Sequence, residues 1–327
     1  MPHILLLGAG FSRNWGGWLA DEAFEYLLGC PQLDDGLRTL LWRYKGQGGF
    51  EGALSELQTE TAKHFTVALL DHHTRLERAI LQMFADMNKA FSTINFEFQN
   101  SIEYLVRSYL VRFDAIFTLN QDVLIEQHYL NQNVALSQYR QWNGWQIPGM
   151  RQLPGEDLRP HVSKWSPVDE SKFAVEKKRQ PYFKLHGSSN WFVDEGSSGR
   201  PLLIMGGNKP DAIDRHPILR WSHARFKEYL SKPETRLMVI GYSFGDEHIN
   251  NAMGEAAKHE TLRLFIIDPS GVDVLEKSNP LTRLFPGSTF ARLQSCVIGA
   301  SRRPMWEIFG GDMVEHGKVM RFFTSAS

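Results

Sequence analysis

Five short apolar runs, each ending at a polar or glycine-rich turn, constrain the fold of this 327-residue chain more than any other feature. Runs that are apolar throughout, with no alternating polar residues, are typical of strands in a parallel sheet whose two faces are both covered by helices. We therefore predict an α/β fold with a Rossmann-like parallel sheet. The predicted strands are His3–Leu7, Asp114–Leu119, Tyr182–Leu185, Leu237–Ile240 and Leu262–Ile267.

The turns after these strands carry the best candidates for binding and catalytic residues. Ligands of open parallel sheets bind beyond the carboxyl ends of the strands. We therefore expect the five turns to converge on one crevice, although they are scattered along the chain from residue 8 to residue 268. Their sequences are GAGFS from Gly8, NQD from Asn120, HGS from His186, GYSFGD from Gly241 and DP from Asp268.

The segments between the strands predict mainly helices. Apolar residues at steps of three, four or seven indicate helix over about residues 53–91. Asn100 and Glu103 have the spacing of a capping box for a second helix. Further helices are expected near residues 19–27 and from Asp246, a good N-cap residue, to about Lys258.

We expect a single domain over residues 1–327 with two insertions. The first is helical and spans about residues 30–112. The second spans about residues 131–180, is rich in Gln, Pro, Trp and charge, and predicts an irregular segment or lid. Its tryptophans, Trp142, Trp145 and Trp165, are interpreted as packing a long loop, and a protein interface is the alternative.

The composition excludes several classes of protein. A formal net charge of -1 gives no bulk field that would favour nucleic acid or an anionic membrane. No stretch reaches the roughly 18 apolar residues of a membrane-spanning helix, and the first apolar run is too short for a signal peptide. The two cysteines, Cys30 and Cys296, cannot form a four-cysteine zinc site. We expect a cytoplasmic protein without a metal, a membrane contact or direct sequence-specific binding of nucleic acid.

The first turn has part of a nucleotide-binding pattern. Gly8 and Gly10 allow a backbone to approach a phosphate closely, Ser12 adds a hydroxyl, and Arg13 adds a cation. Arg13 stands where the dinucleotide fingerprint G-x-G-x-x-G has its third glycine. A plain tight turn after a strand is the alternative interpretation.

Three polar residues at the other strand ends have functional and structural interpretations. His186 has a near-neutral ordinary pKa suited to a general base, or it could bind a backbone carbonyl as a structural residue. Asn120 can orient a water or a ribose hydroxyl, and Asp122 can accept from an amide or a hydroxyl. Both are also favoured at helix starts, and Val123 to Tyr129 has a helical pattern.

Taken together and in order, GAGFS, TLNQD, KLHGS and GYSFGDEHIN resemble the sirtuin-like superfamily. They are most similar to its bacterial branch found in anti-phage defence systems, and the similar blocks run from residue 4 to about residue 268. The resemblance implies that Asn120 and Asp122 hold the nicotinamide riboside of NAD and that His186 is the base. The implied NAD-binding residues are Gly8, Ala9, Gly10, Phe11, Ser12, Arg13, Gln121, Gly241, Ser243 and Asp268.

The chain also departs from one part of that superfamily. Protein-deacylating sirtuins carry a four-cysteine zinc module, whereas this chain has no cysteine between Asn120 and His186. In the defence branch, a helical insertion without that module accompanies NAD hydrolysis. The resemblance therefore implies an NAD+ hydrolase that uses NAD as a substrate, releases nicotinamide and ADP-ribose, and acts by depleting NAD. It also implies a homo-oligomer, or a partner such as a HerA-type ATPase.

Two other functions could use the same pocket. One is an NAD-dependent protein deacylase or ADP-ribosyltransferase, and the other is a non-catalytic assembly subunit that binds NAD or ADP-ribose. A dehydrogenase fits poorly, because no acidic residue clearly follows a second strand about 20 residues beyond the first turn.

Overall fold

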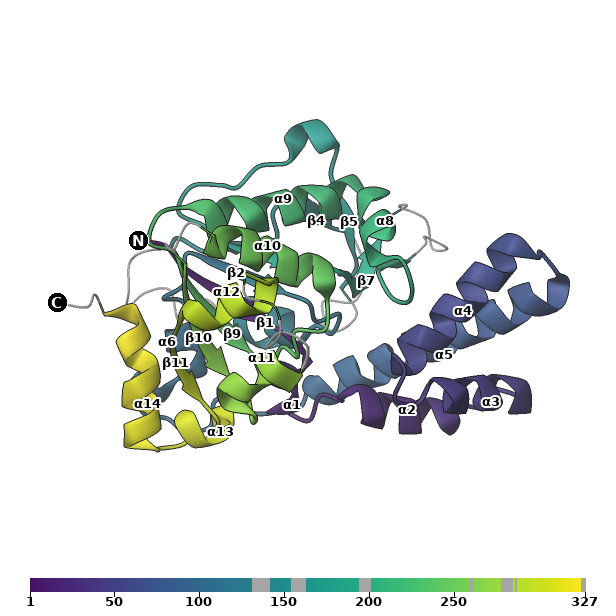
Figure 1. The fold of residues 1–327 in the computed structure, drawn as a ribbon, viewed down its shortest axis with the longest axis horizontal. Helices are drawn as coiled ribbons and strands as arrows, with labels where there is room; N and C mark the ends of the chain where they lie inside the picture. Colours follow the sequence, from purple (N-terminus) through teal and green to yellow (C-terminus); the bar gives the residue numbers. More distant parts are fainter. Residues whose placement is uncertain are drawn as a thin grey trace.

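Seven parallel strands form the central sheet of the protein (Figure 1). The structure is a computed structural model that describes residues 1–130, 142–153, 163–193, 201–258, 262–277, 285 and 287–324. Each strand runs parallel to its neighbours in the sheet. The predicted α/β fold with a parallel sheet is therefore confirmed. In spatial order the strands are β11 (Val297–Ser301), β10 (Arg263–Ile267), β9 (Arg236–Ile240), β1 (His3–Leu7), β2 (Ala115–Thr118), β6 (Gln180–Lys184) and β3 (Trp145–Gln146).

Both faces of this sheet are covered, which explains why its strands are apolar throughout. Successive side chains of a strand point to opposite faces. Ile4 and Leu6 of β1 belong to one buried cluster, whereas Leu5 and Leu7 belong to the other. The first cluster includes residues of α9 (Pro217–Ser231), α10 (Glu247–Ala257), α11 (Val274–Lys277) and α12 (Thr289–Ser295).

A group of four helices extends from the opposite side of the sheet, and we call it the helical arm (Figure 1). It consists of α2 (Ala20–Leu28), α3 (Asp35–Tyr44), α4 (Gly49–Lys63) and α5 (Val67–Phe91). The segment predicted as helical over 53–91 thus contains two helices. Thr66 separates them, because its hydroxyl accepts from the Leu69 amide and begins α5, while the preceding Phe65 is exposed.

Short helices lie on both sides of β2 in the sequence: two connect the helical arm to it, and one follows it. They are η1 (Ile102–Tyr104), α6 (Val106–Leu110) and the π-helix η2 (Glu126–Leu130). The predicted capping box of Asn100 and Glu103 is wrong, because η1 begins after Ser101 without a side-chain cap. Glu97 takes this role for α6 instead, since its carboxylate accepts from the backbone amides of Val106 and Arg107.

A smaller mixed sheet lies beside the central one. It has the order β4 (Met150–Gln152), β5 (Trp165–Pro167), β7 (Gly187–Phe192) and β8 (Pro201–Leu203). Residues 131–141 and 154–162 of the expected second insertion lie outside the described residues. Trp142, Trp145 and Trp165 are partly buried against the core, as predicted, and Trp142 Nε1 donates to the Val111 carbonyl at 3.1 Å.

The remaining described elements are small. They are α1 (Ala9–Arg13), η4 (Glu170–Lys172), α8 (Lys209–Asp214), η5 (Gly271–Asp273), α13 (Met305–Ile308), α14 (Met313–Met320) and η7 (Arg321–Phe323). Among the helices that the structure describes, none combines the length and the apolar character needed to cross a membrane.

Three glycines bring the turns after β1 and β9 into direct backbone contact. The amide of Gly8 donates to the Ile240 carbonyl at 3.0 Å, and the amide of Gly10 donates to the Gly241 carbonyl at 2.9 Å. A Cβ on Gly10 would lie 2.7 Å from Gly241 Cα, and one on Gly241 would lie 2.3 Å from the Gly10 carbonyl carbon. Gly241 also has a left-handed φ of 62°. The two turns therefore fit together only as glycines.

We predict that Gly10→Ala lowers the free energy of unfolding by about 1–3 kcal/mol, because the added methyl meets backbone that cannot move aside. Gly317→Ala in α14 is the control, since no described atom apart from its chain neighbours and its own helix backbone lies within 4 Å of the added Cβ. That substitution should stabilise the helix by about 0.5–1 kcal/mol. Urea titrations measure both, and a Gly10→Ala variant as stable as the parent would contradict the packing argument.

Candidate functional site

The carboxyl ends of the central strands surround one cavity of about 940 Å³. This volume lies in the range of about 300–1,000 Å³ that is usual for ligand pockets. Residues after β1, β2, β6, β9 and β10 line it, so the five turns converge as predicted. The helical arm forms a further wall through Phe50, Glu51, Met83, Phe84 and Met87.

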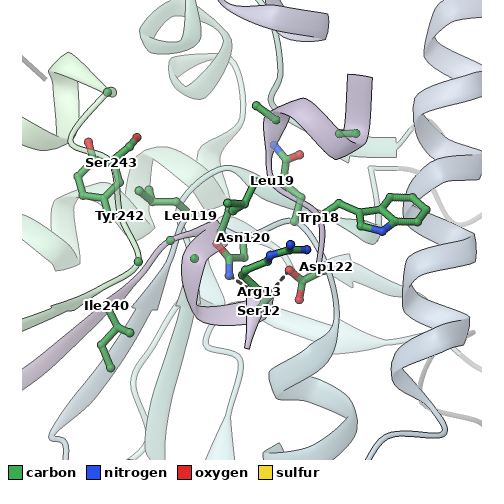
Figure 2. A pocket seen from close by; sticks show the side chains of 18 of the residues that line it. Ser12, Arg13, Trp18, Leu19, Leu119, Asn120, Asp122, Ile240, Tyr242 and Ser243 are labelled. Carbon is green, nitrogen blue, oxygen red and sulfur yellow. Dashed lines mark hydrogen bonds between the residues drawn. The ribbon is translucent and has the colours of Figure 1, made fainter. Parts of the chain in front are cut away.

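The hydroxyl of Ser12 joins the first turn to the turn after β2 (Figure 2). Ser12 Oγ donates to Asp122 Oδ2 at 2.8 Å and accepts from Asn120 Nδ2 at 3.0 Å. All three side chains are buried. The Ser12 hydroxyl, which was expected to contact NAD, thus orients the side chains of Asn120 and Asp122.

This arrangement leaves one hydrogen-bonding atom without a partner. Asn120 Oδ1 is buried, and no group in the described parts of the chain donates to it. A buried polar atom without a partner costs about 1–3 kcal/mol, so such an atom beside a ligand cavity is a candidate contact for ligand or water. The orientation of the Asn120 amide is set, because its Nδ2 already donates to Ser12.

Asp122 has two roles in the same turn. Its Oδ2 accepts from Ser12, and its Oδ1 accepts from the Leu124 amide at 3.0 Å. The second bond satisfies the backbone where the chain enters η2, as the capping interpretation proposed. Gln121 also lines the cavity, but its side-chain amide donates to the Ile204 carbonyl at 2.7 Å.

The remaining residues of the first turn fall into two groups. Gly8, Ala9, Gly10 and Arg13 line the cavity, whereas the ring of Phe11 is fully buried and packs on Trp15. The amides of Gly8 and Gly10 already bond to the end of β9 and its turn, so they are not donors for a phosphate in this arrangement. Arg13 is half exposed and pairs with Glu22 at 2.6 Å.

The turn after β9 is held from within by two residues. Tyr242 Oη accepts from the Asp246 amide at 3.0 Å, and Asn250 of α10 donates to the Phe244 carbonyl at 2.7 Å. Phe244 is fully buried with a φ of 57°, a left-handed conformation that is rare outside glycine. This turn presents Gly241, Ser243 and Asp246 to the cavity, and Asp268 lines it from the neighbouring strand end.

Asp246 begins α10, but its side chain does not cap the helix as predicted. Its Oδ1 instead accepts from Lys209 Nζ at 2.8 Å, and Lys209 also pairs with Glu51 of the helical arm at 2.9 Å. Burial alone would raise the pKa of Asp246, but the ion pair and hydrogen bond with Lys209 help to hold that pKa below the usual value. Burial likewise opposes charge on Lys209, yet Glu51 and Asp246 raise its pKa.

Three histidines gather beside this ion pair. His186 Nε2 lies 3.1 Å from His248 Nε2, and His223 Nε2 lies 2.8 Å from the Leu185 carbonyl oxygen. Burial lowers the pKa of His186 well below its ordinary value, lowers that of His248, and lowers that of His223 to about 4. His186 is therefore neutral near pH 7 and able to accept a proton.

A buried ion pair between Lys184 and Glu126 stabilises the turn after β2. Lys184 Nζ bonds to Glu126 Oε1 at 2.7 Å and donates to the Asp122 carbonyl. Burial raises the pKa of Glu126 in spite of this lysine. Asn88 of α5 adds a second support, since its Oδ1 accepts from the Val123 amide at 3.1 Å and its Nδ2 donates to Ser189 Oγ at 2.9 Å.

Sequence reasoning missed several residues of this site. His248 lies within GYSFGDEHIN, two residues after Asp246, so its position in that block was the available signal. Lys209, Glu51 and Asn88 carried no local signal, because they come from helices that reach the cavity only through the tertiary fold.

The fold and the cavity define an α/β protein with a ligand site at the strand ends, and one comparison with known proteins identifies its family. A family model for the SIR2-like domain matches residues 114–282, just over half of the chain. The chain therefore belongs to the SIR2-like family, which implies a sirtuin-like function involving NAD. The matched region contains the turns after β2, β6, β9 and β10, and the first turn lies outside it. A search of curated proteins finds no match.

We predict that Lys184→Met lowers the free energy of unfolding by about 3–5 kcal/mol, because it leaves the Glu126 carboxylate buried without its cation. The double variant Lys184→Met/Glu126→Gln removes that charge but keeps an oxygen for the Tyr182 hydroxyl, which bonds Glu126 at 3.1 Å. It should therefore be more stable than the single variant by about 1–3 kcal/mol. Equal unfolding midpoints for the single and double variants at pH 7 would show that the buried charge is not the cause.

Proposed function

We propose that the protein is an NAD+ hydrolase that cleaves the bond between nicotinamide and ribose. One observation carries this proposal: Ser12 orients the Asn120 amide, and the Asn120 Oδ1 atom has no donor among the described residues. An oriented acceptor at the strand ends can hold a water, or a ribose hydroxyl, beside the anomeric carbon. Family membership supports NAD as the ligand of this cavity.

The chemistry requires little acid catalysis. When the glycosidic C–N bond breaks, its electron pair stays with the ring nitrogen, so the positively charged pyridinium leaves as neutral nicotinamide. The sugar carbon develops oxocarbenium character, as in other glycoside cleavages. Water then adds to that carbon and loses a proton. The protein must position the water, accept the proton and hold the leaving group, and it can do so without a metal.

His186 is the proposed proton acceptor, and its hydrogen bond with His248 determines which nitrogen acts. If His248 donates, His186 uses its Nε2 lone pair and carries its own proton on Nδ1. If His186 donates, its Nδ1 is unprotonated and available. The proposed reaction therefore requires the second arrangement, or a small rotation of one ring after NAD binds.

Asp122 and the first turn complete the proposed assignment. Asp122 retains lone pairs beyond its bonds to Ser12 and Leu124, and we assign it to the carboxamide or the adjacent ribose. Arg13, paired only at the surface with Glu22, is the proposed partner of the pyrophosphate. Gly241, Ser243 and Asp268 then face the remainder of the dinucleotide.

We predict that the protein releases nicotinamide and free ADP-ribose from NAD with no acylated peptide present. Asn120→Ala and His186→Ala should each lower the rate by at least about 100-fold, since a positioned acceptor or base contributes that much. Asn251→Ala and His64→Ala are matched controls at exposed positions outside the cavity lining.

The products separate this proposal from the alternatives, with nicotinamide and ADP-ribose followed by chromatography. Nicotinamide release that depends on an acylated peptide indicates a deacylase, and ADP-ribose attached to protein indicates a transferase. NAD binding without turnover indicates a non-catalytic subunit. Full activity in either cavity variant contradicts the assigned residues.

We further propose that the enzyme acts in bacterial anti-phage defence by depleting cytoplasmic NAD, and that assembly controls it. A constitutive NAD+ hydrolase would harm its own cell. Exposed apolar side chains on the helical arm support a protein contact, since Trp42, Phe65 and Val67 are 54%, 71% and 80% exposed. A homo-oligomer and a HerA-type ATPase are the proposed partners.

We predict that nicotinamide release rises at least about tenfold when the purified chain is mixed with a HerA-type ATPase and with DNA. A tenfold change corresponds to about 1.4 kcal/mol of differential stabilisation of the active state. Light scattering in the same samples reports whether the chain forms oligomers. An unchanged rate from a chain that stays monomeric under all conditions would contradict control by assembly.

A further inference from the structure

His186, His248 and Asp246 bring three potential metal ligands together at the edge of the cavity. One ligand atom from each of the three residues lies within 4.8 Å of the other two. The two imidazole Nε2 atoms are separated by 3.1 Å. Two nitrogens bound to one tetrahedral zinc ion at about 2.0–2.1 Å are about 3.3 Å apart, so the imidazole pair is already spaced for a shared metal.

The chemistry of this ligand set favours a borderline transition metal. Two neutral imidazoles and one carboxylate are typical ligands of Zn²⁺ and Co²⁺, whereas Mg²⁺ and Ca²⁺ prefer sets made of oxygen alone. A small rotation of the Asp246 side chain would bring the carboxylate to the same ion.

The surrounding residues place these ligands on rigid elements. His186 lies in the two-residue turn between β6 and β7, and Asp246 and His248 lie at the start of α10, where Tyr242 bonds the Asp246 amide. Lys209 bonds Asp246 Oδ1, but a carboxylate has a second oxygen for the metal. Glu51 balances the ammonium charge of Lys209 at 2.9 Å.

We propose that His186, His248 and Asp246 bind one Zn²⁺-class ion, and that this ion inhibits the enzyme. Metal binding at His186 Nε2 would replace the hydrogen bond to His248 and fix the imidazole that is needed as a base. The binding site rests on geometry alone. The inhibitory effect rests on the proposed NAD+ hydrolase function, because it requires His186 to accept a proton during turnover.

The site can be tested without enzyme activity. Chelator-treated protein should take up one equivalent of Zn²⁺ in equilibrium dialysis, and one equivalent of Co²⁺ should give visible d–d absorption that Zn²⁺ displaces. His186→Gln and His248→Gln should each weaken Zn²⁺ binding by at least about tenfold. His223→Gln is the control, since His223 lies in the same cluster but bonds the Leu185 carbonyl and is outside the ligand set.

The binding measurement and the activity measurement each have a defined outcome. Absence of stoichiometric binding, or equal binding by the parent and both ligand variants, overturns the metal site. In the activity measurement, one equivalent of Zn²⁺ should reduce nicotinamide release by at least about tenfold, and a chelator should restore it. Unchanged release from zinc-loaded protein overturns inhibition. If the metal-free parent releases no nicotinamide, the proposed function fails while the binding measurement still decides the site.

Discussion

The hydrogen bonds of a single buried hydroxyl, that of Ser12, connect the two turns on which the site depends. Ser12 lies in α1, the short helix directly after β1, and both of its side-chain partners come from the turn after β2. Because the hydroxyl donates to Asp122 and accepts from Asn120, it fixes which end of the Asn120 amide faces the cavity. The local chemistry of the site is therefore a consequence of how β1 and β2 pair in register.

The other contacts extend this arrangement outward in two directions. Toward β9, the interlocked glycines bring the turn with Asp246 and Ser243 close to the first turn. Toward the helical arm, Asn88 joins α5 to the backbone of Val123. Lys209 then connects the arm to Asp246 through Glu51. The arm is thus structurally part of the cavity, although most of its residues lie away from the sheet (Figure 1).

The sequence predicted the parts of the fold that are strongly apolar and continuous. The runs at β1, β2, β6, β9 and β10 are buried on both faces, and that burial leaves a clear pattern. β11 left no such pattern, because its residues 297–300 are only partly buried or exposed at the sheet edge and include Gly299. β3 is only two residues long. The smaller mixed sheet consists of short strands without a periodic signal.

The position of the site could be predicted from the sequence more readily than the hydrogen bonds and ion pairs within it. Asn120, Asp122 and His186 were recognisable at strand ends, and they line one cavity. Yet the partner of each side chain depends on residues far away in the sequence, which a local pattern does not encode. Asp246 has the residue type and position of a helix cap, but the nearby ammonium of Lys209 provides a stronger, charged partner.

The position of β1 between β2 and β9 has a consequence for how the protein is made. β1 is the first strand synthesised, but one of its neighbours begins only at Arg236. Until β9 has left the ribosome, the first turn lacks the Gly241 contact, and His186 lacks His248. Pairings over such long sequence separations form slowly and late. The growing chain therefore cannot complete its cavity early, so any activity of the cavity would begin only after most of the polypeptide exists.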